Sequence, residues 1–256
     1  MNSENPDLLL FDIEGTTTPI SFVHEILFPY SSSQFSNYLE KNPIPKDVFE
    51  KLVSEYDTDV KSNLYSEESI SESSQQFPKV HKDLFSESEV SSITKYLKFL
   101  VSVDRKSNPL KFLQGKIWEI GYQKGELKSI VYPDVKSCFE RAKTKNIPIF
   151  IYSSGSVQAQ ISIFRYSELG DLTPYINGYF DTAIGGKREA QSYLEILKSL
   201  AKKPERPCFF TDVVEEGFAA SEAGFRVNIL RRPGNKEVIS NRFAMLNDFS
   251  SVILDS

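Results

Sequence analysis

The sequence predicts an α/β fold: a Rossmann-like parallel sheet with helices on both faces, and an all-helical cap domain inserted after the first strand. Two observations predict it. The apolar run Leu8–Phe11 indicates a buried strand, and the acidic and hydroxyl-rich stretch 12–18 follows it directly. From residue 147 onward, strand and helix patterns alternate, which is typical of parallel strands joined by crossover helices.

The elements of the predicted core follow one another in the second half of the chain. They are a helix over 133–145, a strand over 147–152, a helix over 156–166, a strand over 178–183, a helix over 189–202, a strand over 207–211, a helix over 214–223 and a strand over 226–230. The strands are short apolar runs bounded by turn residues, and the helices have apolar residues at helical spacing. We therefore expect residues 1–18 and 131–256 to form one α/β core.

Residues 19–130 have a different, mostly helical pattern. Val90–Val103 and Leu110–Leu127 have the spacing of amphipathic helices, and Pro43 and Pro45 mark a break before them. A segment over about 54–76 is rich in Ser and Glu, so we expect it to be mobile and solvated. An insert at this point predicts a cap, which excludes water and holds the non-reacting part of a substrate.

Composition narrows the class of protein. With 256 residues, 40% hydrophobic and 25% charged, the chain is typical of a globular protein of one or two domains. A net charge of −5 argues against nucleic-acid or acidic-membrane partners, and no apolar stretch is long enough to span a bilayer. The absence of a secretory signal and two cysteines without a CxxC pattern favour a reducing compartment, the cytoplasm and also the nucleus.

Several kinds of catalytic site are disfavoured by what the chain lacks. Two histidines, His24 and His81, are too few for a zinc site with several His or Cys ligands. There is no G-x-S-x-G pattern for a serine hydrolase, and neither cysteine is followed six residues later by arginine. The run 185–188 is not a phosphate-binding Walker loop, because Asp181 stands where its first glycine belongs.

The candidate reacting groups are two carboxylates just after the first strand. In an open α/β sheet, ligands bind outside the carboxyl ends of the strands. Asp12 is therefore a candidate nucleophile that accepts a phosphoryl group, and Glu14 a candidate general acid and base beside it. Acids in this position can also cap a helix or bind water. Whether Asp12 and Glu14 are catalytic therefore depends on the residues at the other strand ends.

Three other predicted strand ends have matching polar residues. Ser153 and Ser154 follow the second strand and could bind phosphate, Lys187 could neutralise its charge, and Asp212 follows a later strand. Magnesium prefers oxygen ligands, and Asp12, Asp212 and the Glu14 carbonyl could supply them. Each residue has an ordinary structural explanation, but together they predict phosphoryl transfer, which depends on positioning and charge stabilisation.

The order Asp-x-acid, Ser, Lys, Asp resembles the haloacid dehalogenase-like hydrolase superfamily along the whole chain, with the insert at the place of its first cap type. The sequence differs from most phosphatases of that superfamily in having Glu14 where they have Asp. Four longer runs are similar to the enolase-phosphatase, or acireductone synthase, family of methionine salvage. They are residues 12–23, 151–160, 179–182 and 232–235.

This resemblance implies two reactions on one small phosphorylated diketone. 2,3-Diketo-5-methylthiopentyl-1-phosphate is enolised and then dephosphorylated to 1,2-dihydroxy-3-keto-5-methylthiopentene, with magnesium as cofactor and the protein as a monomer. It implies that Asp12 and Glu14 are catalytic, that Asp12, Glu14 and Asp212 bind the metal, that Ser153, Ser154 and Lys187 bind substrate, and that Glu216 orients the waters of the metal.

Other functions are also compatible with the sequence. The same superfamily includes phosphatases for other small phosphate esters, and sugar-phosphate mutases that return the phosphate to the substrate. A catalytically silent module that binds a partner through its acidic cap loop is the alternative outside enzymes. The sequence does not identify the base for enolisation. The candidates to hold the methylthio group, chosen for their aromatic character alone, are Phe22, Phe28, Trp118 and Tyr122.

Overall fold

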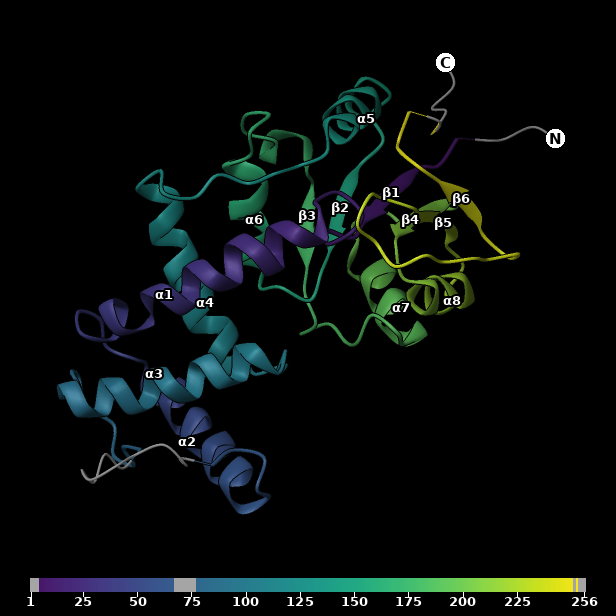
Figure 1. The fold of residues 1–256 in the computed structure, drawn as a ribbon. Helices are drawn as coiled ribbons and strands as arrows, with labels where there is room; N and C mark the ends of the chain where they lie inside the picture. Colours follow the sequence, from purple (N-terminus) through teal and green to yellow (C-terminus); the bar gives the residue numbers. More distant parts are fainter. Residues whose placement is uncertain (1–4, 67–76, 251, 253–256) are drawn as a thin grey trace. The chain divides into compact units, whose positions relative to one another are not determined.

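A computed structural model describes residues 5–66, 77–250 and 252 of the chain (Figure 1). It divides into two compact units, one formed by residues 1–24 and 122–256 and the other by residues 25–121. Both boundaries lie inside the segment 19–130 that the sequence predicts as the insert. The second boundary lies before 130 because Tyr122 belongs to the α/β unit: its hydroxyl lies 2.6 Å from Ser129 Oγ, and its ring stacks on Tyr166.

The α/β unit is built on a parallel sheet, which confirms the predicted fold class. Its strands are β1 (Leu8–Phe11), β2 (Ile149–Tyr152), β3 (Gly178–Phe180), β4 (Pro207–Thr211), β5 (Arg226–Leu230) and β6 (Ala244–Leu246), in the spatial order β3-β2-β1-β4-β5-β6. All neighbouring strands are parallel. The chain passes from β1 to β2 on one side and later to β4 on the other, so β1 lies at the switch point where such sheets bind ligands.

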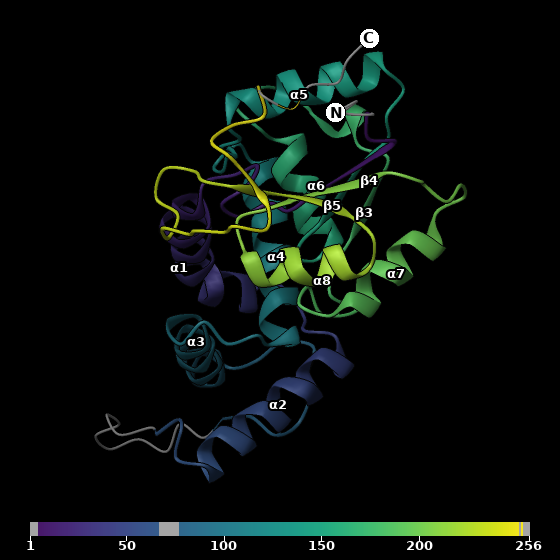
Figure 2. The same cartoon turned by 90° about the vertical axis from the view of Figure 1, so that its right-hand side faces the viewer.

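Helices cover both faces of the sheet. They are α5 (Pro133–Thr144), α6 (Val157–Arg165), α7 (Ala190–Ser199) and α8 (Val214–Glu222). Figure 2 shows α7 and α8 on one side of the strands and α5 and α6 on the other. Side chains of β1 alternate accordingly: Leu8 and Leu10 join the apolar core that includes α7 and α8, whereas Phe11 packs on Phe139 of α5 with ring centroids 5.3 Å apart.

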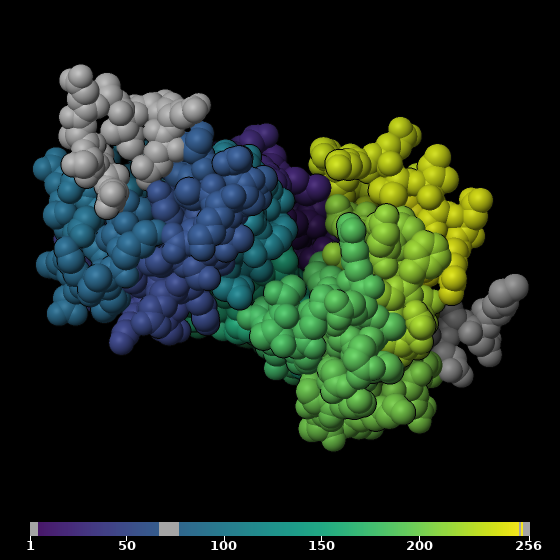
Figure 3. Space-filling view, turned by 90° about the horizontal axis from the view of Figure 1, so that it is seen from below, coloured from purple at the N-terminus to yellow at the C-terminus, as the bar shows by residue number. Residues whose placement is uncertain are grey.

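Two details of the α/β unit differ from the sequence prediction. The strand predicted over 178–183 ends at Phe180, because Asp181 begins a turn in which its carboxylate accepts a hydrogen bond from the Ala183 amide. The three-residue strand β6 was not predicted, since it follows an irregular segment and is held mainly by pairing with β5. Figure 3 shows the C-terminal segment, in yellow, beside the green surface of the helices. The ring of Phe243 packs on that of Phe218 of α8, with centroids 5.2 Å apart.

The second unit is helical. Its helices are α1 (Phe28–Leu39), α2 (Lys46–Lys61), α3 (Glu87–Ser102) and α4 (Asn108–Gln123), and a π-helical turn, Phe22–Leu27, precedes α1. The helices predicted over 90–103 and 110–127 correspond to α3 and α4. Helix α3 begins earlier, at Glu87, because Ser86 and Glu89 form a capping box. Across the described residues, no helix is long and apolar enough to cross a membrane.

The Ser/Glu-rich segment predicted over about 54–76 overlaps the end of helix α2. Helix α2 continues through residue 54 to Lys61, and both Tyr56 and Asp59 on it are buried. Asp59 accepts hydrogen bonds from Tyr96 (2.9 Å) and Arg105 (2.8 Å), which fix this part of the helix in the core of the unit. Residues 67–76 of the predicted mobile segment lie outside the described residues.

Candidate active site

The predicted site residues of the α/β unit follow the carboxyl ends of four neighbouring strands. Asp12 follows β1, Ser153 follows β2, Lys187 lies in the loop after β3, and Asp212 follows β4. The strand register explains why they meet: Phe11 of β1 pairs with Phe210 of β4 on one side and with Ile151 of β2 on the other. The structure thus brings together residues 200 positions apart in the chain.

Lys187 is the central cation of this cluster. Its ammonium lies 2.6 Å from Asp12 Oδ1 and 2.8 Å from Glu216 Oε2, and its side chain is only 9% exposed. Thr211 Oγ1 donates to the same Glu216 oxygen at 2.8 Å. The contact between Lys187 and Glu216 was not predicted from the sequence. It means that one ammonium faces two carboxylates in a largely buried place, where charge–charge interactions are strong.

The pKa values of these groups reflect burial and mutual charge. Burial alone would lower the pKa of Lys187, but Asp12 and Glu216 outweigh it and hold that pKa above its ordinary value. Burial, and then the neighbouring charge of Asp12, raise the pKa of Asp212 to about 7. Burial also raises the pKa of Glu216 to about 6, although Lys187 partly offsets this. The cluster therefore has more negative charge than one lysine compensates.

The residues present fit the predicted magnesium ion by charge and by donor chemistry. Asp12, Asp212 and Glu216 give three carboxylates against the single ammonium of Lys187. Among the described residues, no group of three or more His, Cys, Asp or Glu side chains is arranged as a metal site. Magnesium commonly takes one or two carboxylates, with water and phosphate oxygens completing its shell, so the Asp12 and Asp212 pair is a suitable set.

Gly15 makes room for Asp212. Its φ of +67° is in the left-handed region, and a Cβ atom at this position would lie 2.3 Å from Asp212 Oδ2. A side chain here would be strained and would displace the carboxylate. The glycine in the Asp12–Thr18 loop is therefore required both by the backbone conformation and by the approach of Asp212.

Replacing Asp212 should change how the stability of the metal-free protein depends on pH. The folded-state pKa of Asp212 is about 7 against 3.8 for the ordinary group, so the folded protein loses stability as pH rises from about 4 to 7. Asp212→Asn removes this loss. Thermal unfolding is measured in the presence of a chelator. We expect the Tm of the variant to exceed that of wild type by at least about 2 °C at pH 8, and by a smaller difference at pH 5. An equal gain at both pH values would contradict this explanation.

The loop after β1 is closed by its own hydrogen bonds. The Ile13 carbonyl accepts from the amides of Thr16, Thr17 and Thr18, and the Gly15 amide donates to the Thr18 carbonyl. The Ile13 amide donates to Asp12 Oδ1 at 2.7 Å, which fixes the orientation of the Asp12 carboxylate. Glu14 lies on the same loop and is partly exposed.

Ser153 and Ser154 begin the loop between β2 and α6. Ser153 is buried, its amide donates to the Phe180 carbonyl at 3.2 Å, and its hydroxyl accepts from the Gly155 amide at 3.3 Å. Ser154 is partly exposed. The cap of α6 is Ser156, whose hydroxyl accepts from the Ala159 amide, so the helix does not use the hydroxyls of the two preceding serines as its cap.

The groups that hold the Lys187 loop were not predicted from the sequence. Three consecutive carbonyls, those of residues 185, 186 and 187, each accept a hydrogen bond at 2.8 Å from a buried hydroxyl. The donors are Tyr152, Ser192 and Tyr193, in that order. Tyr152 ends β2, and the other two lie on α7. The signal in the sequence was weak, because a serine and two tyrosines at core positions can be satisfied in many ways.

Removing one of these hydroxyls tests whether they matter for Lys187. Ser192→Ala deletes the donor to the Gly186 carbonyl, and one hydrogen bond is worth about 1 kcal/mol. We expect turnover to fall by about three- to tenfold, since 1.4 kcal/mol corresponds to a factor of ten. Ser167→Ala is the matched control, because Ser167 is also buried and donates to the Gly170 carbonyl away from the site. Equal activity in both variants would contradict the assignment.

Comparison with known proteins reveals close relatives over most of the chain. A model of the family described as "Hydrolase: haloacid dehalogenase-like hydrolase" matches residues 6–224. A protein named enolase-phosphatase E1 from Leptospira borgpetersenii serovar Hardjo-bovis (strain JB197) is 46% identical over 229 residues, 90% of each chain. A protein of the same name from Drosophila willistoni is 42% identical over 258 residues, 97% of each chain.

Solved structures have the same fold. The UTR4 protein from Saccharomyces cerevisiae superposes with a TM-score of 0.71 at 31% identity, over 96% of this chain and 100% of that chain. CbbY from Rhodobacter sphaeroides in complex with phosphate superposes with a TM-score of 0.56 at 14% identity, over 96% of each chain. The second match shows similarity of fold alone.

Proposed function

This chain belongs to the haloacid dehalogenase-like hydrolases and, within them, to the enolase-phosphatase family, and from this membership we infer a bifunctional enzyme of methionine salvage. It enolises 2,3-diketo-5-methylthiopentyl-1-phosphate and dephosphorylates the enol to 1,2-dihydroxy-3-keto-5-methylthiopentene. The observation that most supports phosphatase chemistry is the ion pair between Lys187 and Asp12 at the end of β1, with a separation of 2.6 Å.

We propose that Asp12 is the nucleophile of phosphate release. The contacts of Lys187 and of the Ile13 amide both engage Oδ1, so Oδ2 is the oxygen that attacks phosphorus. A bond forms between Oδ2 and phosphorus, and the ester bond between phosphorus and the enol oxygen breaks. Water then attacks the aspartyl-phosphate, which regenerates the Asp12 carboxylate and gives inorganic phosphate.

Glu14 is proposed as the acid and base of both half-reactions. It gives its proton to the leaving enol oxygen and takes one from the attacking water, so it ends in its starting protonation state. Its place on the same closed loop as Asp12, two residues further on, supports this role.

Asp12, Asp212 and the Glu14 carbonyl are the proposed ligands of Mg²⁺, and Glu216 is proposed to orient its waters. When bound, the ion supplies charge stabilisation for oxygens of the dicarbonyl group and of the phosphate. Ser153 and Ser154 are proposed to donate hydrogen bonds to the substrate phosphate, and Lys187 to offset the charge of the phosphate and of Asp12. The excess negative charge around Lys187 supports this assignment.

We also propose that the chain acts as a monomer in the cytoplasm on this small molecule, without nucleic-acid or membrane partners. The net charge of −5 supports the absence of a nucleic-acid partner. Two buried cysteines, both free thiols, support a reducing compartment.

A substrate comparison tests this function against the alternative of a phosphatase for another small ester. Phosphate release is measured with the diketo phosphate and with a panel of phosphorylated sugars and organic acids, each in Mg²⁺. We expect kcat/KM for the diketo phosphate to exceed that of every other ester by at least about 10²-fold, corresponding to about 2.7 kcal/mol. A panel member hydrolysed equally well would contradict the proposed substrate.

A further inference from the structure

A turn after β5, residues 232–235, lies against the loop that begins with Asp12. We propose that Arg232 and Asn235 are positioning residues, which hold the Asp12–Thr18 loop by its main-chain carbonyls and so fix the Asp12 and Glu14 side chains for reaction. The functional part of this proposal rests on the proposed function of those two acids. The structural part rests on the hydrogen bonds from the turn to the loop carbonyls.

Arg232 reaches the loop from the far end of the sequence. It is only 6% exposed, and its Nε donates to the Thr16 carbonyl at 3.0 Å. Its two terminal nitrogens donate to the two carboxylate oxygens of Asp134, at 3.1 Å and 2.7 Å. This paired geometry defines the plane of the guanidinium, so the direction of Nε toward Thr16 is defined as well.

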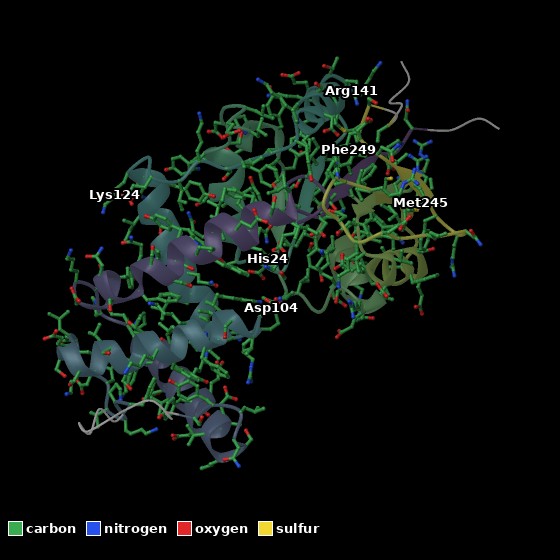
Figure 4. The ribbon with its side chains drawn as sticks, in the orientation of Figure 1. His24, Asp104, Lys124, Arg141, Met245 and Phe249 are labelled. Atoms are coloured by element: carbon green, nitrogen blue, oxygen red, sulfur yellow. The ribbon has the colours of Figure 1, made fainter. Side chains whose placement is uncertain are left out.

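Aromatic rings enclose the same guanidinium. Its central carbon lies 4.2 Å from the ring centre of Tyr132 and 4.8 Å from that of Phe249. The Phe249 amide donates to Asp134 at 2.8 Å, and Arg141 donates to the Phe249 carbonyl at 2.7 Å; Figure 4 labels Arg141 and Phe249 in the upper part of the α/β unit. Asp134, Tyr132 and Phe249 therefore hold Arg232 from several sides, whereas Arg141 binds the main chain of Phe249.

Phe249 also connects this network to the two strands that precede the acids. Its ring packs edge-on against Phe11 and Phe210, with centroids 5.2 Å and 5.4 Å apart. Phe11 directly precedes Asp12, and Phe210 lies two residues before Asp212. Phe249 thus contacts the ends of β1 and β4, while the turn 232–235 contacts the loop.

Asn235 holds the neighbouring peptide unit. Its Nδ2 donates to the Gly15 carbonyl at 2.8 Å, and its amide closes the turn by donating to the Arg232 carbonyl at 3.1 Å. A Cβ atom on Gly15 would lie 3.0 Å from Asn235 Nδ2 and 2.3 Å from Asp212 Oδ2. Asn235 and Asp212 therefore approach the same side of Gly15.

Three consecutive carbonyls of the loop are held in this way by residues far away in sequence. The Gly15 carbonyl accepts from Asn235, the Thr16 carbonyl from Arg232, and the Thr17 carbonyl from the Tyr132 amide at 3.0 Å. The amides of Gly15, Thr16, Thr17 and Thr18 are bonded within the loop, and the Asp12 amide donates to the Phe210 carbonyl at 2.9 Å, so the three carbonyl contacts attach the far part of the loop to the rest of the unit. Reacting groups misplaced by about 1 Å can lose about 10²-fold in rate, so this attachment matters for catalysis.

The experiment compares Asn235→Ala and Arg232→Met with Arg141→Met. The control removes an arginine hydrogen bond to the same C-terminal segment, at the Phe249 carbonyl, and leaves the three loop contacts in place. Amide hydrogen exchange of residues 12–18 is measured without substrate. In the first two variants we expect exchange to be faster by at least about fivefold, and in Arg141→Met to match wild type.

Kinetics with the diketo phosphate test the positioning role. We expect kcat to fall by about 10–100-fold in Asn235→Ala and Arg232→Met, with KM within about threefold of wild type, because neither residue is proposed to touch substrate. Unchanged exchange in both folded variants would overturn the inference, and so would faster exchange with an unchanged kcat. If Arg232→Met fails to fold because Asp134 is left unpaired, Asn235→Ala decides.

The two proposals fail in different ways. If wild-type protein does not turn over the diketo phosphate, the proposed function is wrong, and the exchange measurement still decides whether the turn holds the loop. If wild type is active and Asn235→Ala exchanges and reacts like wild type, the inference about the turn is wrong and the proposed function stands.

Discussion

Asp12→Asn is expected to abolish phosphate release, by about 10⁴-fold or more, while the protein stays folded. The amide of asparagine is a poor nucleophile, and the loss of a group that forms the covalent intermediate is large in comparable enzymes. The substitution is close to isosteric, and Lys187 keeps its contact with Glu216 at 2.8 Å. Phosphate release and thermal unfolding should be measured on the same preparation.

Asp181→Asn is a matched control for the nucleophile. Asp181 directly follows β3 at the same edge of the sheet, but its carboxylate accepts a hydrogen bond from the Ala183 amide in a turn. It should retain the activity of wild type within about threefold, as expected for a group outside the chemistry. Beryllium fluoride should protect wild type and Asp181→Asn against unfolding but not Asp12→Asn. Wild-type-like turnover by a clean Asp12→Asn preparation would exclude the covalent mechanism.

Glu14→Gln should slow phosphate release by about 10²–10⁴-fold, the usual contribution of a general acid and base. The glutamine side chain keeps the length and polarity of Glu14 but can neither give nor take the required proton. The loop itself should be unaffected, because it is closed by backbone hydrogen bonds to the Ile13 carbonyl. Single-turnover kinetics separate the chemical step from product release.

Glu215→Gln is the control for this second substitution. Glu215 lies on the first turn of α8, is exposed, and stands close in sequence to Asp212. Its neutralisation tests whether any loss of negative charge near the site slows the reaction. A loss smaller than tenfold in Glu14→Gln, or an equal loss in Glu215→Gln, would show that Glu14 is not the acid and base.

The sheet and the position of its acids could be predicted because strand patterns are local. Leu8–Phe11 and Pro207–Thr211 are continuous apolar runs, and the parallel fold places residues after such runs at one edge. The ion pair between Asp12 and Lys187 follows from that rule. The resemblance of four sequence runs to the enolase-phosphatase family is confirmed by relatives that are 40–46% identical.

Contacts that depend on tertiary packing could not be predicted. Lys187 contacts Glu216 because the loop after β3 lies beside the first turn of α8. No local sequence pattern predicts this contact. Arg232 was part of a recognised run, but its bond to the Thr16 carbonyl joins residues 216 positions apart. The extension of helix α2 to Lys61 was not predicted, because the Ser- and acid-rich composition of residues 54–61 does not indicate that Tyr56 and Asp59 are buried.

Following both reactions in one wild-type sample tests the proposed bifunctional activity most directly. The ultraviolet absorbance of the enol and the release of phosphate are recorded together after the diketo phosphate is mixed with enzyme and Mg²⁺. We predict that the enol phosphate forms first. Inorganic phosphate then appears after a lag, as the enol phosphate decays, and its final amount equals that of the enol phosphate formed. Phosphate released without a preceding enol, or an enol that accumulates with no phosphate, would contradict an enzyme that performs both steps.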